Sequence, residues 1–157
     1  MAEPIAHRRL AALLALAAPA SRLLVAAIFV AAAIPKLLDP LAFSAAIGNY
    51  QVFPYWSWNA LTALVPMLEL VAAAMLLCRS TRRAGALILS SLTLAFIALI
   101  ASVLVRGVDV ECGCFGQSVA AENVGWPLLL RDLLLLLGIA VGSRPAALEP
   151  DDAADSW

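Results

Sequence analysis

Apolar residues are gathered in four stretches, each close to the length that a membrane-spanning helix needs. A helix crosses the ~30 Å hydrocarbon core of a bilayer with about 20 mostly apolar residues. The four stretches are Leu23–Leu38, Trp58–Leu77, Ala84–Val105 and Trp126–Gly142. The pattern predicts an all-α integral membrane protein whose four transmembrane helices form a bundle.

Only Ala84–Val105 is free of charged residues, whereas the other stretches contain Lys36, Glu69 or the pair Arg131 and Asp132. A charge in an apolar helix needs a partner or a place near the membrane interface. The region between the first two stretches is also uncharged, but polar residues and proline interrupt it. We predict a loop there, with a short interfacial helix around Leu41–Tyr50.

The basic residues indicate the orientation. Four spans place the N-terminus, the middle loop and the C-terminus on one side of the membrane, and cytoplasmic segments carry an excess of Lys and Arg. The sequence puts seven arginines on that side: Arg8, Arg9, Arg22, Arg79, Arg82, Arg83 and Arg144. Both termini are therefore predicted to be cytoplasmic, in the inner (plasma) membrane. The aromatic residues agree, since five fall near the predicted outer interface: Tyr50, Tyr55, Trp56, Trp58 and Trp126.

The membrane domain is predicted to cover residues 22–142, with a flanking segment at each end. Residues 1–21 resemble a secretory signal peptide, with basic residues 7–9 before an apolar run and small residues after it. A second apolar run follows almost at once, which favours a cytoplasmic or interfacial helix ended by Pro19. Residues 143–157 are predicted to be a disordered acidic tail.

Composition excludes whole classes of protein. Of the 157 residues, 64% are hydrophobic and 13% are charged, and the mean hydropathy is +0.95. An average soluble domain is about a quarter charged. The apolar excess needs lipid to cover it, so the bilayer is a predicted partner. A net charge of -1 leaves no basic surface for a phosphate backbone, so no nucleic-acid partner is predicted.

The motif Cys112-Gly113-Cys114-Phe115-Gly116 is the sharpest chemical feature, and it falls in the predicted outer loop 106–125. Thiols on an oxidising face tend to pair. Cysteines two residues apart approach the window for a disulfide, and Gly113 supplies unusual dihedral angles. A strained ring of this size is easily reduced. We predict that Cys112 and Cys114 are the catalytic dithiol, and that Gly113, Phe115 and Gly116 contact the partner.

Two other interpretations of the cysteine motif remain open. A purely structural bridge gains little from so short a loop. Structural zinc usually takes four Cys or His ligands, and the single histidine, His7, lies on the opposite face. Asp109 and Glu111 offer oxygen ligands, a less usual match for soft metals bound by thiolates. No metal site is predicted.

Five charged residues form a predicted supporting network near the same face: Lys36, Glu69, Arg106, Arg131 and Asp132. Ion pairing between helices explains them structurally. Functionally, cations near a thiol favour the reactive thiolate, and Glu69 or Asp132 would orient those cations. Glu69 shares a helix face with Pro66, its expected partner is Lys36 or Arg131, and it is a candidate proton relay.

The small and sulfur-containing residues inside the stretches have simpler interpretations. Cys78 ends the second stretch and is predicted to be a buried, small hydrophobic residue. Small residues let helices approach closely. We assign that role to Ala31–Ala33, Ala72–Ala74, Gly85 and Gly138.

Over residues 21–142, the chain resembles the MauE branch of the DoxX-like membrane proteins. The resemblance rests on five features: Pro35-Lys36-Leu37, Asn49-Tyr50, Pro66 with Glu69, the Cys112–Gly116 motif, and Arg131-Asp132. It implies a four-helix membrane bundle acting in thiol redox chemistry, with a periplasmic or membrane-anchored thioredoxin-like partner. The family's namesake is linked to maturation of the disulfide-rich small subunit of methylamine dehydrogenase.

The chain is also similar to DsbB- and VKOR-type disulfide generators in helix number and sidedness, but it lacks their second outer cysteine pair. No cofactor is therefore predicted, and a quinone has no support. The predicted function is a membrane thiol–disulfide component that supports disulfide formation or maturation of an exported protein. Thiol–disulfide oxidoreductase activity is the candidate enzyme activity, and whether the chain is an enzyme stays open. The alternatives are a non-catalytic anchor subunit of a redox complex and a membrane protein that binds a metal or small molecule.

Overall fold

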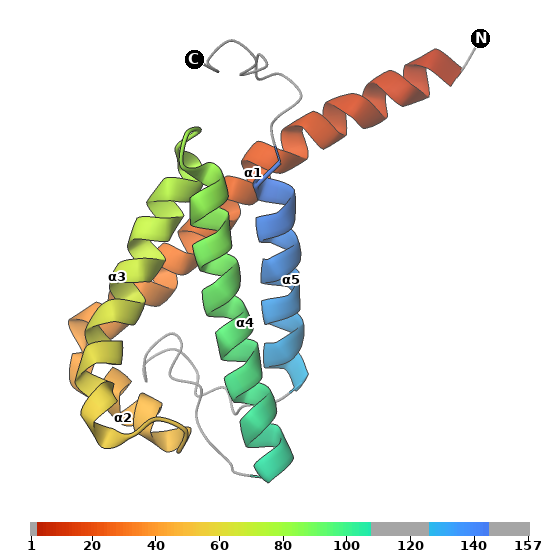
Figure 1. Cartoon of the computed structure of the whole chain (residues 1–157). Coiled ribbons are helices and arrows are strands. Elements are labelled where there is room, and N and C mark those ends of the chain that lie inside the picture. The colour runs from red at the N-terminus through yellow and green to blue at the C-terminus, as the bar shows by residue number, and fades with distance from the viewer. Residues whose placement is uncertain (1–2, 108–125, 145–157) are drawn as a thin grey trace.

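The computed structural model describes residues 3–107 and 126–144, with side chains from residue 17 onward, and its described elements are all helical (Figure 1). The helices are α1 (Glu3–Leu38), α2 (Pro40–Asn49), the 3-10 helix η1 (Tyr55–Ser57), α3 (Trp58–Leu77), α4 (Arg82–Arg106) and α5 (Trp126–Gly142). The four predicted stretches lie within α1, α3, α4 and α5, and α2 lies where the short interfacial helix is predicted.

The four long helices pack in a ring. α1 packs against α3 and α5, and α4 packs against the same two helices. The turn between α3 and α4 lies at the same end of the bundle as the C-terminal end of α5, whereas α2 lies at the other end (Figure 1). We call the first the arginine end, because it holds five of the described arginines: Arg22, Arg79, Arg82, Arg83 and Arg144. The second is called the α2 end.

Small residues allow close packing, as predicted. A Cβ atom added to Gly85 of α4 would lie 2.6 Å from the backbone nitrogen of Leu76 and 2.8 Å from the carbonyl oxygen of Ala72, both in α3. Ala72 and Ala33 are both fully buried. On α5, a Cβ at Gly138 would lie 3.1 Å from a methyl group of Val25 in α1. The backbones of neighbouring helices therefore approach to distances that larger residues forbid.

Two local signals set the boundaries of helices at the α2 end. Asp39 caps α2 because its side chain accepts a hydrogen bond from the Ala42 amide at 3.0 Å, and Pro40 then occupies the first turn. α4 ends at Gly107, whose φ of +64° is left-handed and whose amide donates to the Leu104 carbonyl. These caps fix where the connecting segments leave the bundle.

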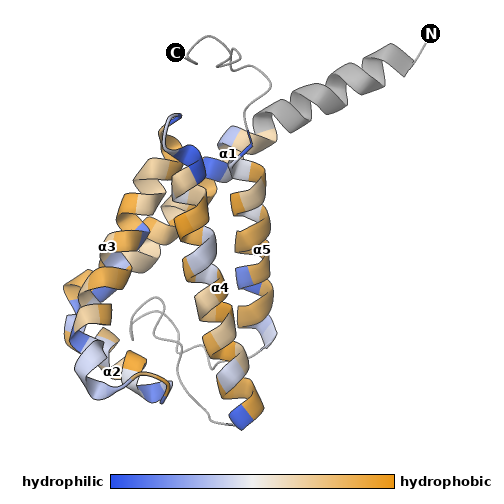
Figure 2. Cartoon of the chain, in the orientation of Figure 1, coloured by the Kyte–Doolittle hydropathy of each residue, from blue (hydrophilic) through white to orange (hydrophobic). Residues whose placement is uncertain are grey.

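The outward faces are apolar, as expected for contact with lipid. Hydrophobic residues run along the lengths of the helices, and hydrophilic ones gather mainly toward the two ends (Figure 2). Within the described residues, three helical stretches are long and apolar enough to cross a membrane: Ala17–Leu38, Tyr55–Leu77 and Arg82–Arg106. α5 packs with them, but has 17 residues. The protein is an all-α, multi-pass membrane protein.

The structure corrects the predicted end of the first helix. α1 continues through Pro19 as one helix of 36 residues, so Pro19 does not end it. A proline removes a single backbone donor, and membrane helices tolerate that loss when their other hydrogen bonds persist. The predicted tail lies outside the described residues, apart from Ser143 and Arg144.

Arg22 of α1 forms hydrogen bonds to the C-terminal end of α5 at the arginine end. Its Nε donates to the Gly142 carbonyl at 2.7 Å, and its Nη2 donates to the Arg144 carbonyl at 2.6 Å. The side chain is buried, and the Gly142 position leaves it room. The last carbonyls of α5 thereby find donors, and the positive charge lies at the negative end of the helix dipole.

Candidate functional site

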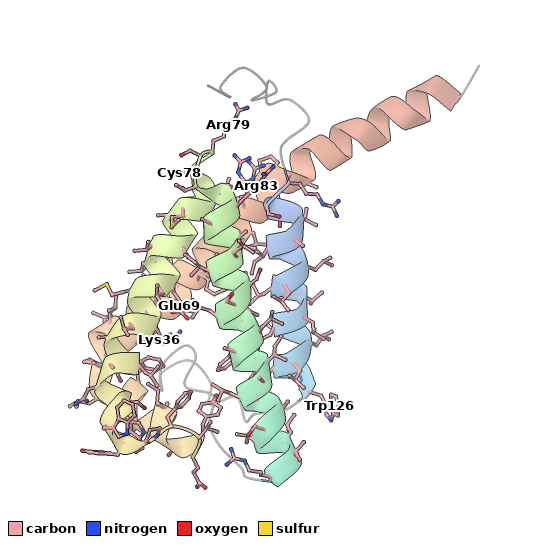
Figure 3. All side chains as sticks on the ribbon, viewed as in Figure 1. Lys36, Glu69, Cys78, Arg79, Arg83 and Trp126 are labelled. Atoms are coloured by element: carbon pink, nitrogen blue, oxygen red, sulfur yellow. The ribbon has the colours of Figure 1, made fainter. Side chains whose placement is uncertain are left out.

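Lys36 and Glu69 form a buried ion pair between α1 and α3 (Figure 3). Lys36 Nζ donates to both Glu69 carboxylate oxygens, at 2.5 and 2.7 Å. Phe43 of α2 places its ring 5.4 Å from the same ammonium group. Pro66 is buried with Glu69, which confirms their predicted common face. Of the two partners predicted for Glu69, the structure selects Lys36.

Arg131 and Asp132 form a second pair at the start of α5. Arg131 donates to Asp132 Oδ1 through Nη2 at 3.2 Å and Nε at 3.3 Å. Asp132 shares the inner face of α5 with Leu128 and Ile139 and is only 2% exposed. Its second oxygen, Oδ2, is buried and accepts no hydrogen bond from the residues that the structure describes.

Tyr50, which follows α2, lies against α4 inside the bundle. It packs edge-on against Phe96, with ring centroids 6.3 Å apart, and also contacts Val103. The side chain is 4% exposed, so its ring packs inside the bundle and does not face lipid. Burial and, to a smaller extent, the Asp132 charge raise the pKa of Tyr50, while the Arg131 charge lowers it, and together they bring it to about 12.

The interior charges therefore form one polar cluster, which we define as Lys36, Tyr50, Glu69, Arg131 and Asp132. Arg131 connects its parts, because its charge acts on both Lys36 and Tyr50. The cluster lies in the half of the bundle nearer the α2 end. Four of the five residues of the predicted charge network belong to it, and Tyr50 was not among the predicted site residues.

Arg106, the fifth residue of the predicted network, lies at the rim. It is exposed at the last turn of α4, where Nε donates to the Ser102 carbonyl and Nη2 donates to the Tyr50 carbonyl at 2.6 Å. Its described hydrogen bonds therefore go to backbone oxygens. Arg106 holds the segment after α2 against α4 and so indirectly positions Tyr50.

The predicted dithiol lies outside the described residues: Cys112, Gly113, Cys114, Phe115 and Gly116 belong to segment 108–125. The chain leaves the described bundle at Gly107 and re-enters it at Trp126, and both positions lie toward the α2 end (Figures 1 and 3). The segment that carries the two cysteines is thus attached at the same end as the polar cluster.

Cys78 is exposed, contrary to the prediction that it is buried. It directly follows α3 and has an extended backbone, with φ of -78° and ψ of 130°. Because the helix has ended, Cys78 does not continue the inner face formed by Ala72, Ala73 and Leu76. It lies at the arginine end, beside Arg79 (Figure 3).

Among the described residues, no group of three His, Cys, Asp or Glu side chains could hold a metal ion. A shallow pocket of about 380 Å³ lies where α1, α2 and α3 meet. Its lining includes Lys36, Ser44, Asn59 and Thr62 beside apolar residues. Lys36 is already bonded to both oxygens of Glu69, so the lining offers a ligand mainly neutral polar groups.

The sequence model of the family described as "Methylamine utilisation protein MauE" matches residues 9–144. The chain belongs to the MauE family. The resemblance seen in the motifs is confirmed, and the match extends beyond residues 21–142 at both ends. No solved structure gives a significant match to this chain.

Curated MauE proteins are similar over most of the chain. The methylamine utilization protein MauE of Paracoccus denitrificans is 33% identical over 132 residues, covering 82% of this chain and 70% of that protein. The one from Methylophilus methylotrophus is 34% identical over 114 residues, covering 72% and 60%. The one from Paracoccus versutus is 28% identical over 140 residues, covering 87% and 74%.

Proposed function

We propose that this MauE-family chain is a membrane thiol–disulfide exchange component that acts through Cys112 and Cys114. In this proposal four helices cross the inner membrane, with the arginine end in the cytoplasm and the α2 end outside. The uneven distribution of described arginines between the two ends supports that orientation. The cysteine segment then lies on the oxidising side, where disulfides persist.

One observation carries the proposal: the segment with both cysteines is attached at the end of the bundle that holds the buried polar cluster. Charged groups inside a membrane helix bundle are costly and commonly mark functional paths. Arg106 precedes the segment, and Arg131 lies five residues after Trp126. Cationic groups at both attachments would favour a thiolate, which is the nucleophile in thiol–disulfide exchange.

The exchange needs no further oxidant or reductant. A thiolate of a partner dithiol attacks one sulfur of the Cys112–Cys114 disulfide, forming a mixed disulfide and releasing the other cysteine as a thiolate. The second partner thiol then attacks the mixed disulfide and leaves the partner oxidised. Two electrons and two protons pass from the partner to this chain, and the reverse sequence reduces the partner.

The partner is proposed to be an extracytoplasmic thioredoxin-like protein, because such proteins present a reactive cysteine pair of matching chemistry. The names of the relatives support a place in methylamine utilisation. We further propose that the exchange supports the maturation of an exported protein that contains disulfides.

A trapping experiment tests the exchange. In a Cys78→Ser background, which removes the exposed thiol, Cys114→Ser leaves Cys112 as the single cysteine. We expect it to retain a mixed disulfide with the partner that is released by reductant, because the resolving thiol is missing. The partner is identified by mass spectrometry after purification without reductant, and the reciprocal Cys112→Ser variant is treated in the same way.

The matched control retains Cys78 and replaces both Cys112 and Cys114 by Ser. Trapping by this control as well would trace the adduct to Cys78. Exchange is contradicted if neither single-cysteine variant captures a thioredoxin-like protein and the dithiol is inert to redox buffers. Full activity of the control in maturing the exported protein would instead support a non-catalytic anchor.

A further inference from the structure

Three arginines are concentrated where α3 turns into α4, at the end of the bundle opposite the polar cluster. Arg79 lies in the turn 78–81, and Arg82 and Arg83 open α4. Arg79 and Arg83 are exposed, whereas Arg82 is only 7% exposed. Figure 3 shows Arg79 and Arg83 at the same end of the molecule. The turn therefore presents two accessible guanidinium groups, with a third positive charge beside them.

The carboxylates that the structure describes lie away from this turn. Their residues are Asp39, Glu69 and Asp132, and all three lie at the α2 end or in the half of the bundle nearer to it. The first turn of α4 also contains no acidic residue. The positive end of a helix dipole disfavours cations such as Arg82 and Arg83 and favours anions. An anion at the turn is therefore electrostatically favourable.

Packing between α3 and α4 holds the turn in one shape. Thr81 Oγ1 donates to the Met75 carbonyl of α3 at 3.1 Å, and the Gly85 amide donates to the Thr81 carbonyl at 2.9 Å. Gly85 has no Cβ and so lets α4 lie directly on the α3 backbone. The backbone on either side of the turn is thereby fixed before any ligand binds, which lowers the entropic cost of binding.

Exposed leucines border the two accessible arginines. Leu77, the last residue of α3, is 46% exposed, and Leu87 of α4 is 69% exposed. Leu87 follows Arg83 by four residues, so the two share a face of α4. Figure 2 shows a hydrophilic turn at the end of mainly hydrophobic helices. A ligand at Arg83 thus meets a positive group and an apolar surface together, as a phospholipid does with its phosphate and acyl chain.

We propose that Arg79 and Arg83 bind the phosphate of an anionic phospholipid, whose acyl chain packs on Leu77 and Leu87. Guanidinium groups donate paired hydrogen bonds to phosphate oxygens. The bound phosphate also offsets the repulsion among the three arginines, so it stabilises the contact between α3 and α4. The site lies at the opposite end of the bundle from the attachments of the cysteine segment, and it does not depend on thiol–disulfide exchange.

Lipid titration followed by native mass spectrometry tests the site in the purified full chain. Phosphatidylglycerol is the anionic probe, and phosphatidylcholine with the same acyl chains is the neutral one. Each basic residue near a lipid surface strengthens binding about fivefold, so Arg79→Gln/Arg83→Gln should weaken phosphatidylglycerol binding about 30-fold. Phosphatidylcholine binding should not change. Arg79→Lys/Arg83→Lys should give an intermediate affinity, because it keeps the charge and loses the paired hydrogen bonds.

Arg144→Gln is the matched control, because it removes an exposed arginine from the same end but from the segment after α5. It should bind phosphatidylglycerol nearly as well as the unmutated chain. If Arg144→Gln loses as much affinity as Arg79→Gln or Arg83→Gln does alone, binding follows total charge and the site is wrong.

Melting temperature in a neutral detergent gives a second readout that needs no variant. Phosphatidylglycerol should raise it more than phosphatidylcholine does. Soluble glycerol 1-phosphate, which lacks acyl chains, should neither reproduce that rise nor displace the lipid. Displacement would indicate a site for free phosphate and overturn the assignment to a lipid.

The carboxylates of segment 145–157 are the anions of this chain that could compete for the arginines: Glu149, Asp151, Asp152 and Asp155. A variant with all four changed to the corresponding amides tests this. The proposal is overturned if the unmutated chain shows no preference for phosphatidylglycerol, whether or not the amide variant does. A preference gained only in the amide variant would assign the arginines to these carboxylates instead.

Discussion

Lys36 and Glu69 join α1 to α3 by a buried ion pair in which one ammonium group serves both carboxylate oxygens. Their side chains are 8% and 9% exposed, so neither charge is satisfied by solvent. Charges in this position stabilise the bundle only as a pair, because desolvation opposes each of them separately. The pair therefore makes the contact between α1 and α3 sensitive to the loss of either residue.

Removing one member should be worse than removing both. Glu69→Ala leaves the Lys36 charge buried and should lower the free energy of unfolding by about 3–5 kcal/mol. The double variant Lys36→Met/Glu69→Leu should recover much of that loss, because it leaves no charge unpaired. Thermal denaturation in detergent measures both. Similar melting temperatures for Glu69→Ala and Asp39→Asn, which changes an exposed carboxylate, would contradict the prediction.

Gly85 should tolerate no side chain. In an ordinary helix, Gly→Ala stabilises by up to about 1 kcal/mol. Here the added Cβ would meet backbone atoms of Leu76 and Ala72 at 2.6 and 2.8 Å, and backbone cannot rotate away. We expect Gly85→Ala to cost about 1–3 kcal/mol, as overpacking does, seen as a lower melting temperature.

Gly138→Ala is the control for Gly85, because its Cβ would meet a side-chain methyl of Val25 at 3.1 Å, which can shift. Its melting temperature should fall less. If Gly138→Ala lowers the melting temperature as much as Gly85→Ala does, backbone contact between α3 and α4 is not what limits the residue at Gly85.

Tyr50 should ionise late in an alkaline titration. Its pKa is raised from 10.0 to about 12, so the folded protein holds the phenol proton more tightly than the unfolded chain does. The resulting stabilisation is complete below pH 10 and is lost as the pH rises toward 12. Tyrosinate absorbance should show a phase near pH 12 that disappears in Tyr50→Phe and persists in Tyr55→Phe. A late phase that survives Tyr50→Phe would refute this assignment.

The long helices could be predicted because lipid imposes a length on them. The apolar pattern predicts a transmembrane helix over Ala84–Val105, and the observed helix α4 runs from Arg82 to Arg106. It is slightly longer because it continues to the polar residues that border the apolar core. The Lys36–Glu69 pair could be predicted for a similar reason. An interior charge needs an opposite charge, and few were available.

Other features depend on tertiary contacts that a local pattern does not contain. In the sequence, an aromatic residue that follows a helix gives the same pattern whether its side chain faces lipid or the bundle interior. Only the contacts of Tyr50 with Phe96 and Val103 show that it faces the interior. Cys78 follows an apolar run, yet the helix ends one residue earlier and exposes it. Likewise, the sequence cannot show that Asp132 Oδ2 accepts no hydrogen bond from the described residues, because this depends on where its neighbours lie.

Labelling at the two ends of α5 should decide whether this helix spans the membrane. In a background with the three cysteines replaced by Ser, single substitutions Trp126→Cys and Arg144→Cys place one thiol at each end of α5, both at exposed positions. If α5 spans the membrane in the proposed orientation, a membrane-impermeant maleimide should label Trp126→Cys in intact cells with a permeable outer membrane. Arg144→Cys should react only after lysis.

A variant with Cys78 as its single cysteine should behave like Arg144→Cys, because both thiols lie at the arginine end. Labelling of both Trp126→Cys and Arg144→Cys from the same side would show that α5 does not cross the membrane and would reduce the number of spans to three.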